Sequence, residues 1–132
     1  MPVEPEQLPY SGESAKSALA FKRYLEDAER GKTSLQLLAV SQQITPVIRS
    51  SWSGRTFTSV QTPVGLFDPI VCNISYHFHK HGQTFGTILV FTREAKRYFE
   101  ENRANAVSGE GNLLKLPRGI YEADGRVVSY FG

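Results

Sequence analysis

The sequence has few of the residues that support covalent or metal crosslinking: 132 residues include a single cysteine. The lone Cys72 excludes an internal disulfide framework and a zinc site built on cysteines. No run of 18 apolar residues is present, so the sequence predicts no membrane-spanning helix. The first 20 residues lack the basic and apolar regions of a signal peptide. These absences predict one soluble domain that folds without a covalent crosslink.

The net charge is small, but its distribution is uneven. The chain carries 15 Lys and Arg against 13 Asp and Glu, a net charge of +2 with histidine neutral. From residue 30 to residue 93, all three histidines and a run of basic residues accompany one acid, Asp68; the basic residues are Arg30, Lys32, Arg49, Arg55, Lys80 and Arg93. If these groups share a face, that face attracts a polyanion such as a nucleic acid. If they are scattered over the surface, the pattern has no function, and charge alone does not decide between the two.

The hydrophobic pattern predicts an α+β fold in which N-terminal helices precede an antiparallel β-meander. Residues 1–13 are expected to be a flexible lead-in, and residues 14–132 a single domain. The expected helices span 14–30, 34–43 (ending before Pro46) and 93–106, the last capped by Thr92. The expected strands span 56–60, 113–116, 120–122 and 126–131, with Asp124-Gly125 as the turn of the last hairpin.

The segment Tyr76–Gly86, with the sequence YHFHKHGQTFG, contains the residues best suited to chemistry. As a helix, it places His77 and His81 on one face beside Lys80 and directs its two phenylalanines, seven residues apart, toward the core. The spacing of the phenylalanines favours this helical interpretation.

A strand gives the same histidines a different role. It places His77, His79 and His81 on one face, the arrangement that a zinc site uses. The β-like residues Ile70–Ile74 just before them keep this interpretation open, although Lys80 next to a metal ion would be repelled by it. In a third interpretation, the histidines are solvated surface groups without a function.

A histidine beside a lysine, with no acidic cluster able to hold Mg²⁺, suits the cleavage of RNA. Cleavage needs a group that exchanges a proton near neutral pH, which imidazole provides, and cations that stabilise the pentacoordinate phosphate. The ribose 2′-hydroxyl is the nucleophile, so no cofactor or metal is expected. Strict alternation along 126–131 places Val127, Ser129 and Phe131 on one face and Val128 and Tyr130 on the other. Ser129 can then donate a hydrogen bond to a phosphate oxygen, and Phe131 or Tyr130 can stack on a base or belong to the core.

Three pieces of the sequence together resemble a known family. They are the run His77-x-x-Lys80-His81-Gly82-x-x-Phe85-Gly86, the helix expected after Thr92, and a closing Asp-Gly turn followed by Ser129-Tyr130-Phe131. Their order and spacing resemble the colicin D-type ribonuclease domain, which also occurs at the C-termini of contact-dependent inhibition toxins and other polymorphic bacterial toxins. The resemblance covers about residues 74–132.

The resemblance implies a compact α+β nuclease of the barnase, EndoU, colicin and RelE-like group. Such a nuclease cleaves tRNA in the anticodon loop without a metal, by attack of the 2′-hydroxyl that leaves a 2′,3′-cyclic phosphate. By position, His81 would be the principal acid/base group, Lys80 would stabilise phosphate charge, and Ser129 would match the hydroxyl residue of the last strand. His77 is a further catalytic candidate on the same helical face.

This sequence departs from colicin D at two places. Phe131 stands where colicin D has a tryptophan, and Phe78 or His79 stands where it has a second basic residue. Lys115 and Arg118, shortly before the last hairpin, are candidates for the missing cation. The expected RNA-binding residues are therefore Phe131, Tyr130, Arg118, Lys115 and Arg55.

The family also implies partners and a location. The substrate would be tRNA, with neither DNA nor a membrane involved, and a dedicated acidic immunity protein would cover the active site. The domain would be part of a longer secreted or delivered bacterial effector that acts in the cytoplasm of a target cell. Two other functions stay open: a metal-binding protein or metalloenzyme that uses His77, His79 and His81, and a non-catalytic RNA-binding module.

Overall fold

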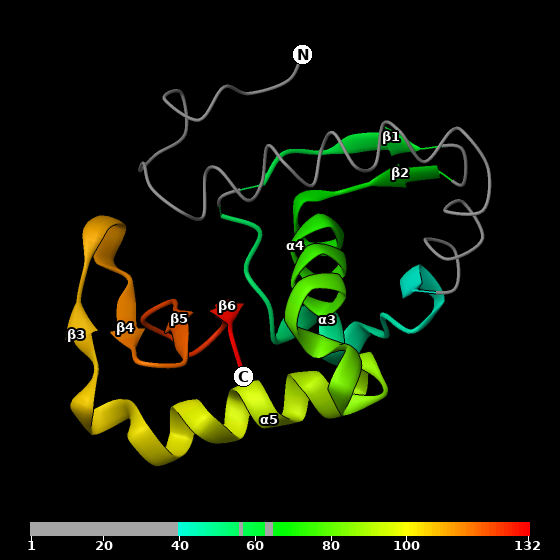
Figure 1. Ribbon diagram of the computed structural model, residues 1–132. Coiled ribbons are helices and arrows are strands. Elements are labelled where there is room, and N and C mark those ends of the chain that lie inside the picture. The colour runs from blue at the N-terminus through cyan, green and yellow to red at the C-terminus, as the bar shows by residue number, and fades with distance from the viewer. Residues whose placement is uncertain (1–39, 56, 63–64) are drawn as a thin grey trace.

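The computed structural model describes residues 40–55, 57–62 and 65–132 (Figure 1). The elements, in chain order, are α3 (Pro46–Ser50), β1 (Val60–Thr62), β2 (Gly65–Phe67), α4 (Pro69–His77), α5 (Ile88–Asn102), β3 (Val107–Ser108), β4 (Leu114–Leu116), β5 (Gly119–Tyr121) and β6 (Val127–Tyr130). A π-helical turn (Phe78–Gly82) and a 3₁₀ turn (Gln83–Phe85) join α4 to α5. The expected α+β fold with an antiparallel meander is confirmed. The expected lead-in, the helix over 14–30 and the start of the helix over 34–43 lie outside the described residues.

Helix α4 begins where the chain supplies both a cap and a proline. The Asp68 carboxylate accepts a hydrogen bond from the Val71 amide at 3.0 Å, and Pro69 occupies the first helical turn, where its missing N–H costs nothing. The residues over 70–74 that have a β-like sequence therefore lie in a helix. The strand interpretation of this segment and of the histidines that follow is wrong, because the cap and the proline outweigh the weak β preference of Ile and Val.

Helix α5 begins five residues earlier than the sequence pattern predicted. Thr87, not Thr92, caps it, accepting from the Val90 amide at 3.2 Å. Thr92 lies inside the helix and is buried, and its hydroxyl accepts a hydrogen bond from the Trp52 indole Nε1 at 2.9 Å. Both threonines are followed by helical sequence, and only the tertiary contact with the single tryptophan distinguishes them.

The four-stranded sheet has the order β3-β4-β5-β6, and every pair is antiparallel. Its β6 edge is extended by the segment after α3, since the Ser53 amide donates to the Val127 carbonyl and the Val127 amide to the Ser51 carbonyl, each at 2.9 Å. The expected strand over 56–60 is displaced: β1 starts at Val60 and pairs with β2, outside this sheet. Residues 57–59 are not in a strand and precede the β1–β2 hairpin.

An extra residue in β6 changes which side chains face the core. Tyr121 is opposite Val127, whereas Ile120 is opposite Ser129, so Val128 has no partner of its own on β5. Val127 and Tyr130 both lie in the main core, and Val128 packs in a small separate cluster. The strict alternation expected along this strand is therefore wrong between Val127 and Ser129.

The main core lies between α5, α4 and the inner face of the sheet. In Figure 1, α5 runs beneath both the sheet and α4. The buried apolar residues of this core include Trp52, Ile74, Phe78, Ile88, Phe91, Ala95, Phe99, Tyr121, Val127 and Tyr130. Ala95 and Phe99 are the fully buried positions of α5 in its second half, and Tyr98 packs partly buried against the same core. No helix within the described ranges has the length and apolar character needed to cross a bilayer.

Candidate active site

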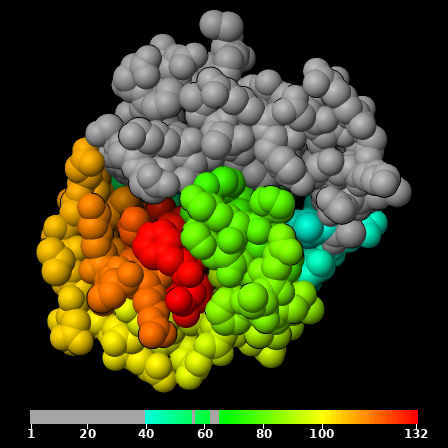
Figure 2. Space-filling model, viewed as in Figure 1, coloured from blue at the N-terminus to red at the C-terminus, as the bar shows by residue number. Residues whose placement is uncertain are grey.

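The turn that follows α4 lies beside the end of β6. Figure 2 shows the C-terminal residues (red) at the surface, between the β4–β5 hairpin (orange) and α4 with its following turn (green). The helical interpretation of the histidine segment is confirmed: the His77 and His81 rings are stacked, with centroids 6.1 Å apart and planes 16° apart. Phe78 is buried against Phe91, and Phe85 packs on the core, as their spacing predicted.

His81 is half-buried and lies directly beside the terminal strand. The edge of its ring faces the Phe131 ring, with centroids 5.7 Å apart. Neither of its ring nitrogens makes a hydrogen bond or ion pair with another residue in the described part of the chain. Partial burial, and after it the ammonium of Lys80, hold the pKa of His81 below its usual value. His81 is therefore mostly neutral at pH 7 and can accept a proton.

His77 differs from His81 in being buried and fully engaged. It is 5% exposed. Its Nδ1 lies 2.5 Å from Asn73 Oδ1 and 3.2 Å from the Asn73 carbonyl oxygen, and its Nε2 lies 3.0 Å from Ser129 Oγ. Burial, followed by the positive charge of His81, lowers the pKa of His77 to about 3, although the hydrogen bond with Asn73 acts in the opposite direction. His77 is therefore neutral at physiological pH.

The low pKa of His77 makes stability depend on pH. In the unfolded chain this group has an ordinary pKa of 6.5, so below that pH the unfolded state binds a proton that the folded state does not. We expect the free energy of unfolding to fall by up to about 1.4 kcal/mol per pH unit below pH 6.5. Urea unfolding at pH 7.5 and pH 5.0 measures this loss. His77→Gln removes the titrating group, and equal pH dependence in this variant and the wild type would contradict the assignment.

Lys80 and His79 are both exposed on the turn between α4 and α5. The ammonium of Lys80 lies 5.5 Å from the centroid of the Tyr76 ring, within the range of a cation–π contact. The positive charge of Lys80 also opposes protonation of the His81 ring. The structure thus brings together the expected pair of an imidazole and an ammonium.

The two C-terminal aromatic residues occupy different environments. Phe131 is 42% exposed, beside His81, where its ring can meet a base. Tyr130 is 4% exposed, and its ring packs against Phe85, Phe91 and Tyr98. Tyr130 therefore matches the alternative in which it belongs to the core.

The two expected cations near the last hairpin lie at different positions relative to the C-terminal strand. Arg118 is exposed and adjoins the site, because its carbonyl accepts a hydrogen bond from the Phe131 amide at 2.8 Å. Its guanidinium lies 6.0 Å from the Tyr98 ring centroid. Lys115 is exposed on β4, opposite Ile120, which is itself opposite Ser129 on β6. Two strand spacings, about 10 Å, therefore separate the backbone of Lys115 from that of Ser129.

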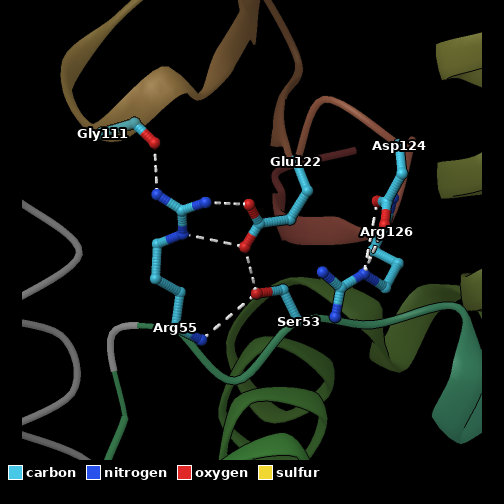
Figure 3. A network of polar contacts seen from close by, with 6 residues as sticks. All are labelled: Ser53, Arg55, Gly111, Glu122, Asp124 and Arg126. Carbon is cyan, nitrogen blue, oxygen red and sulfur yellow. Dashed lines mark hydrogen bonds and ion pairs between the residues drawn. The ribbon is translucent and has the colours of Figure 1, made fainter.

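Arg55 links two segments of the fold through hydrogen bonds and an ion pair (Figure 3). Its Nε donates to Glu122 Oε2 at 2.9 Å, its Nη2 donates to Glu122 Oε1, and its Nη1 donates to the Gly111 carbonyl. The hydroxyl of Ser53 donates to the same Glu122 carboxylate at 2.5 Å. Arg55 therefore joins the segment after α3 to the β5–β6 hairpin, and its role in RNA binding stays a prediction.

The arrangement of the histidines does not form a metal centre. Within residues 40–55, 57–62 and 65–132, no group of three or more His, Cys, Asp or Glu side chains is placed to hold a metal ion. His77 uses both ring nitrogens inside the protein, whereas His79 is exposed on the turn. The geometry therefore gives no support to a site built on His77, His79 and His81.

Gly82 fixes the position of the turn that carries His81. A Cβ at this position would lie 2.6 Å from Phe78 Cδ1 and 2.9 Å from Phe91 Cγ, closer than real contacts allow. We expect Gly82→Ala to destabilise the protein by about 1–3 kcal/mol, because the two rings are packed in the core. Chemical denaturation measures this loss, with the exposed, neighbouring Thr84→Ala as a control that stays within about 0.5 kcal/mol of wild type. Equal stability of both variants would contradict the tight packing.

Asn73 was missed at the sequence level. It lies four residues before His77, the spacing that places both on one helical face, but the β-like sequence of residues 70–74 conceals this signal. Comparison of the chain with protein-family models, with curated proteins and with solved structures gives no match. The geometry of these residues and the resemblance of their pattern therefore carry the proposed function.

Proposed function

We propose that this protein is a metal-independent endoribonuclease whose principal acid/base group is His81. One observation carries the proposal: the His81 ring lies at the surface between His77 and Phe131, beside the Lys80 ammonium, and within the described residues nothing occupies its nitrogens. An imidazole that is neutral near pH 7 and available to solvent is suited to proton transfer with a substrate.

The proposed reaction balances without a cofactor. His81 takes the proton from the ribose 2′-hydroxyl, whose oxygen attacks the adjacent phosphorus. Lys80 stabilises the added negative charge of the pentacoordinate phosphate. The bond from phosphorus to the 5′-oxygen then breaks, and His81 returns the proton to that oxygen. The products are a 2′,3′-cyclic phosphate and a 5′-hydroxyl.

The surroundings of His81 favour a single-stranded RNA segment. Phe131 offers an exposed ring on which an unpaired base can stack, and the exposed Arg118, whose carbonyl accepts a hydrogen bond from the Phe131 amide, is the cation we assign to a phosphate. An anticodon loop presents such unpaired bases, which agrees with the tRNA substrate that the resemblance implies. From the same family resemblance we propose that the domain is the toxin of a delivered bacterial effector. An acidic immunity protein would then neutralise it by covering the positive charges of Lys80 and Arg118.

Incubation of the protein with total tRNA, with and without EDTA, tests the proposal. We expect discrete cleavage products in both samples. Products that disappear with EDTA would overturn metal independence and favour a metalloenzyme. Binding that weakens steeply with salt, without any product, would indicate a non-catalytic RNA-binding module.

A further inference from the structure

Below His81 lies a chain of buried polar groups whose hydrogen-bond directions follow from chemistry. The Asn73 amide group contacts the Ser53 carbonyl oxygen through Nδ2 and His77 Nδ1 through Oδ1. A carbonyl oxygen only accepts, so the amide nitrogen must face Ser53 and the amide oxygen must face His77. The amide oxygen also only accepts, so His77 Nδ1 carries a hydrogen and donates it to Asn73.

The same reasoning continues to the terminal strand. A neutral imidazole carries one hydrogen, and in His77 this hydrogen is on Nδ1. Nε2 is therefore an acceptor, and the hydroxyl of Ser129 donates its only proton to it across 3.0 Å. Asn73, His77 and Ser129 are 1%, 5% and 2% exposed, so water does not compete for these bonds. In this state Ser129 has no proton left to donate to a phosphate oxygen.

We propose that Asn73, His77 and Ser129 form a buried relay that holds a neutral imidazole as the support on which the His81 ring is positioned. Asn73 and His77 are then positioning residues that act through His81, and Ser129 holds His77 instead of contacting the phosphate. This inference rests on the proposed ribonuclease function, in which His81 is the group that touches the substrate.

Two properties of the relay matter for His81. First, His81 is held by ring contacts, stacked on His77 and edge-on to Phe131, so an immobile His77 ring limits where the His81 nitrogens point. Second, a His77 that stays neutral adds no positive charge 6.1 Å from the His81 ring. A charged ring at that distance would make protonation of His81 less favourable.

Within the described part of the chain, no carboxylate contacts His77, so no negative charge favours its protonation. The groups that face its ring are Asn73, Tyr76, Lys80 and His81 from its own helix and the following turn, Trp52 and Phe57 from the segment before β1, and Ser129 from β6. Of these, only Lys80 and His81 can carry positive charge near neutral pH. Both oppose protonation of His77.

Nuclear magnetic resonance of protein labelled with ¹⁵N-histidine tests the relay without any substrate. We expect His77 to remain the neutral tautomer with hydrogen on Nδ1 from pH 5 to pH 8, while His81 titrates. A His77 ring that carries hydrogen on Nε2, or that titrates near pH 6.5, would overturn the proposal.

Asn73→Asp tests the coupling to His81. The carboxylate keeps an acceptor for Nδ1 but loses the donor to the Ser53 carbonyl, so circular dichroism must first show that the variant folds. It favours the protonated form of His77, whose positive charge lies one helical turn from His81, whereas the new negative charge lies two turns away. We therefore expect the His81 pKa to fall by about 0.5 unit. The acid limb of the pH–rate profile of RNA cleavage should move to lower pH by the same amount. Asn105→Asp, which adds the same charge at an exposed site, should move neither.

The outcomes separate the two proposals. An Asn73→Asp protein that loses activity equally at every pH, with an unchanged His81 pKa, would show a merely structural role and overturn the relay alone. A wild-type protein that cleaves no RNA would overturn the proposed function, whatever the tautomer of His77.

Discussion

His81→Ala is expected to lower the rate of tRNA cleavage by about 10²- to 10⁴-fold, the range for loss of a general acid/base group. The fold should survive, because the His81 ring is half-buried and forms ring contacts but no hydrogen bond with other described residues. Cleavage is measured by gel electrophoresis of end-labelled tRNA, and folding by circular dichroism and thermal unfolding.

His79→Ala is the matched control for this change. His79 lies two residues before His81 on the same turn and is exposed. Its variant should cleave tRNA within a few-fold of the wild-type rate, because a change on the surface away from the reacting atoms leaves the acid/base group in place. If His81→Ala retained the activity and His79→Ala lost it, the assignment of the principal acid/base group would be wrong.

Glu122→Ala is expected to lower the free energy of unfolding by about 3 kcal/mol. The Glu122 side chain is 7% exposed and that of Arg55 is 31% exposed, so removal of the carboxylate leaves a largely buried cation without its partner. The Ser53 hydroxyl loses its acceptor at the same time. We place the effect at the lower end of the range for broken buried ion pairs, because Arg55 keeps some contact with solvent.

Asp124→Ala provides a control in the same hairpin. Asp124 and Arg126 form an ion pair at 2.9 Å, with side chains that are 59% and 45% exposed (Figure 3). Exposed pairs contribute about 0–1 kcal/mol, and the variant also loses an exposed hydrogen bond from the Arg126 amide, so we expect less than half the loss of Glu122→Ala in urea unfolding. Equal destabilisation by Glu122→Ala and Asp124→Ala would contradict the structural role of the Arg55–Glu122 pair.

The meander was predictable because its signals are local. The Asp124-Gly125 turn lies between β5 and β6, and Gly125 adopts the positive φ of +93° that favours glycine in a tight turn. The start of α4 was also encoded locally, in Asp68 followed by Pro69, but the β-like residues after them concealed it. The start of α5 could not be predicted from local sequence, because the contact that buries Thr92 joins it to Trp52, 40 residues away.

In the candidate site, too, local features were predictable from the sequence and long-range contacts were not. Helical spacing predicted that His77 and His81 share a face, and the family resemblance implied that Ser129 and Phe131 belong to the same site. Spacing did not show that His77 is buried and His81 accessible, since this depends on the packing of α4 against β6. The pairing of Arg55 with Glu122 joins residues 67 positions apart, so no local pattern contained it.

The chemical nature of the cleaved ends tests the central claim most directly. tRNA is incubated with the protein in EDTA, and the new termini are identified by mass spectrometry. Attack by the 2′-hydroxyl predicts a 2′,3′-cyclic phosphate on one fragment and a 5′-hydroxyl on the other. Fragments that carry a 5′-phosphate and a 3′-hydroxyl would show attack by water from outside the ribose, and would contradict the mechanism assigned to His81 and Lys80.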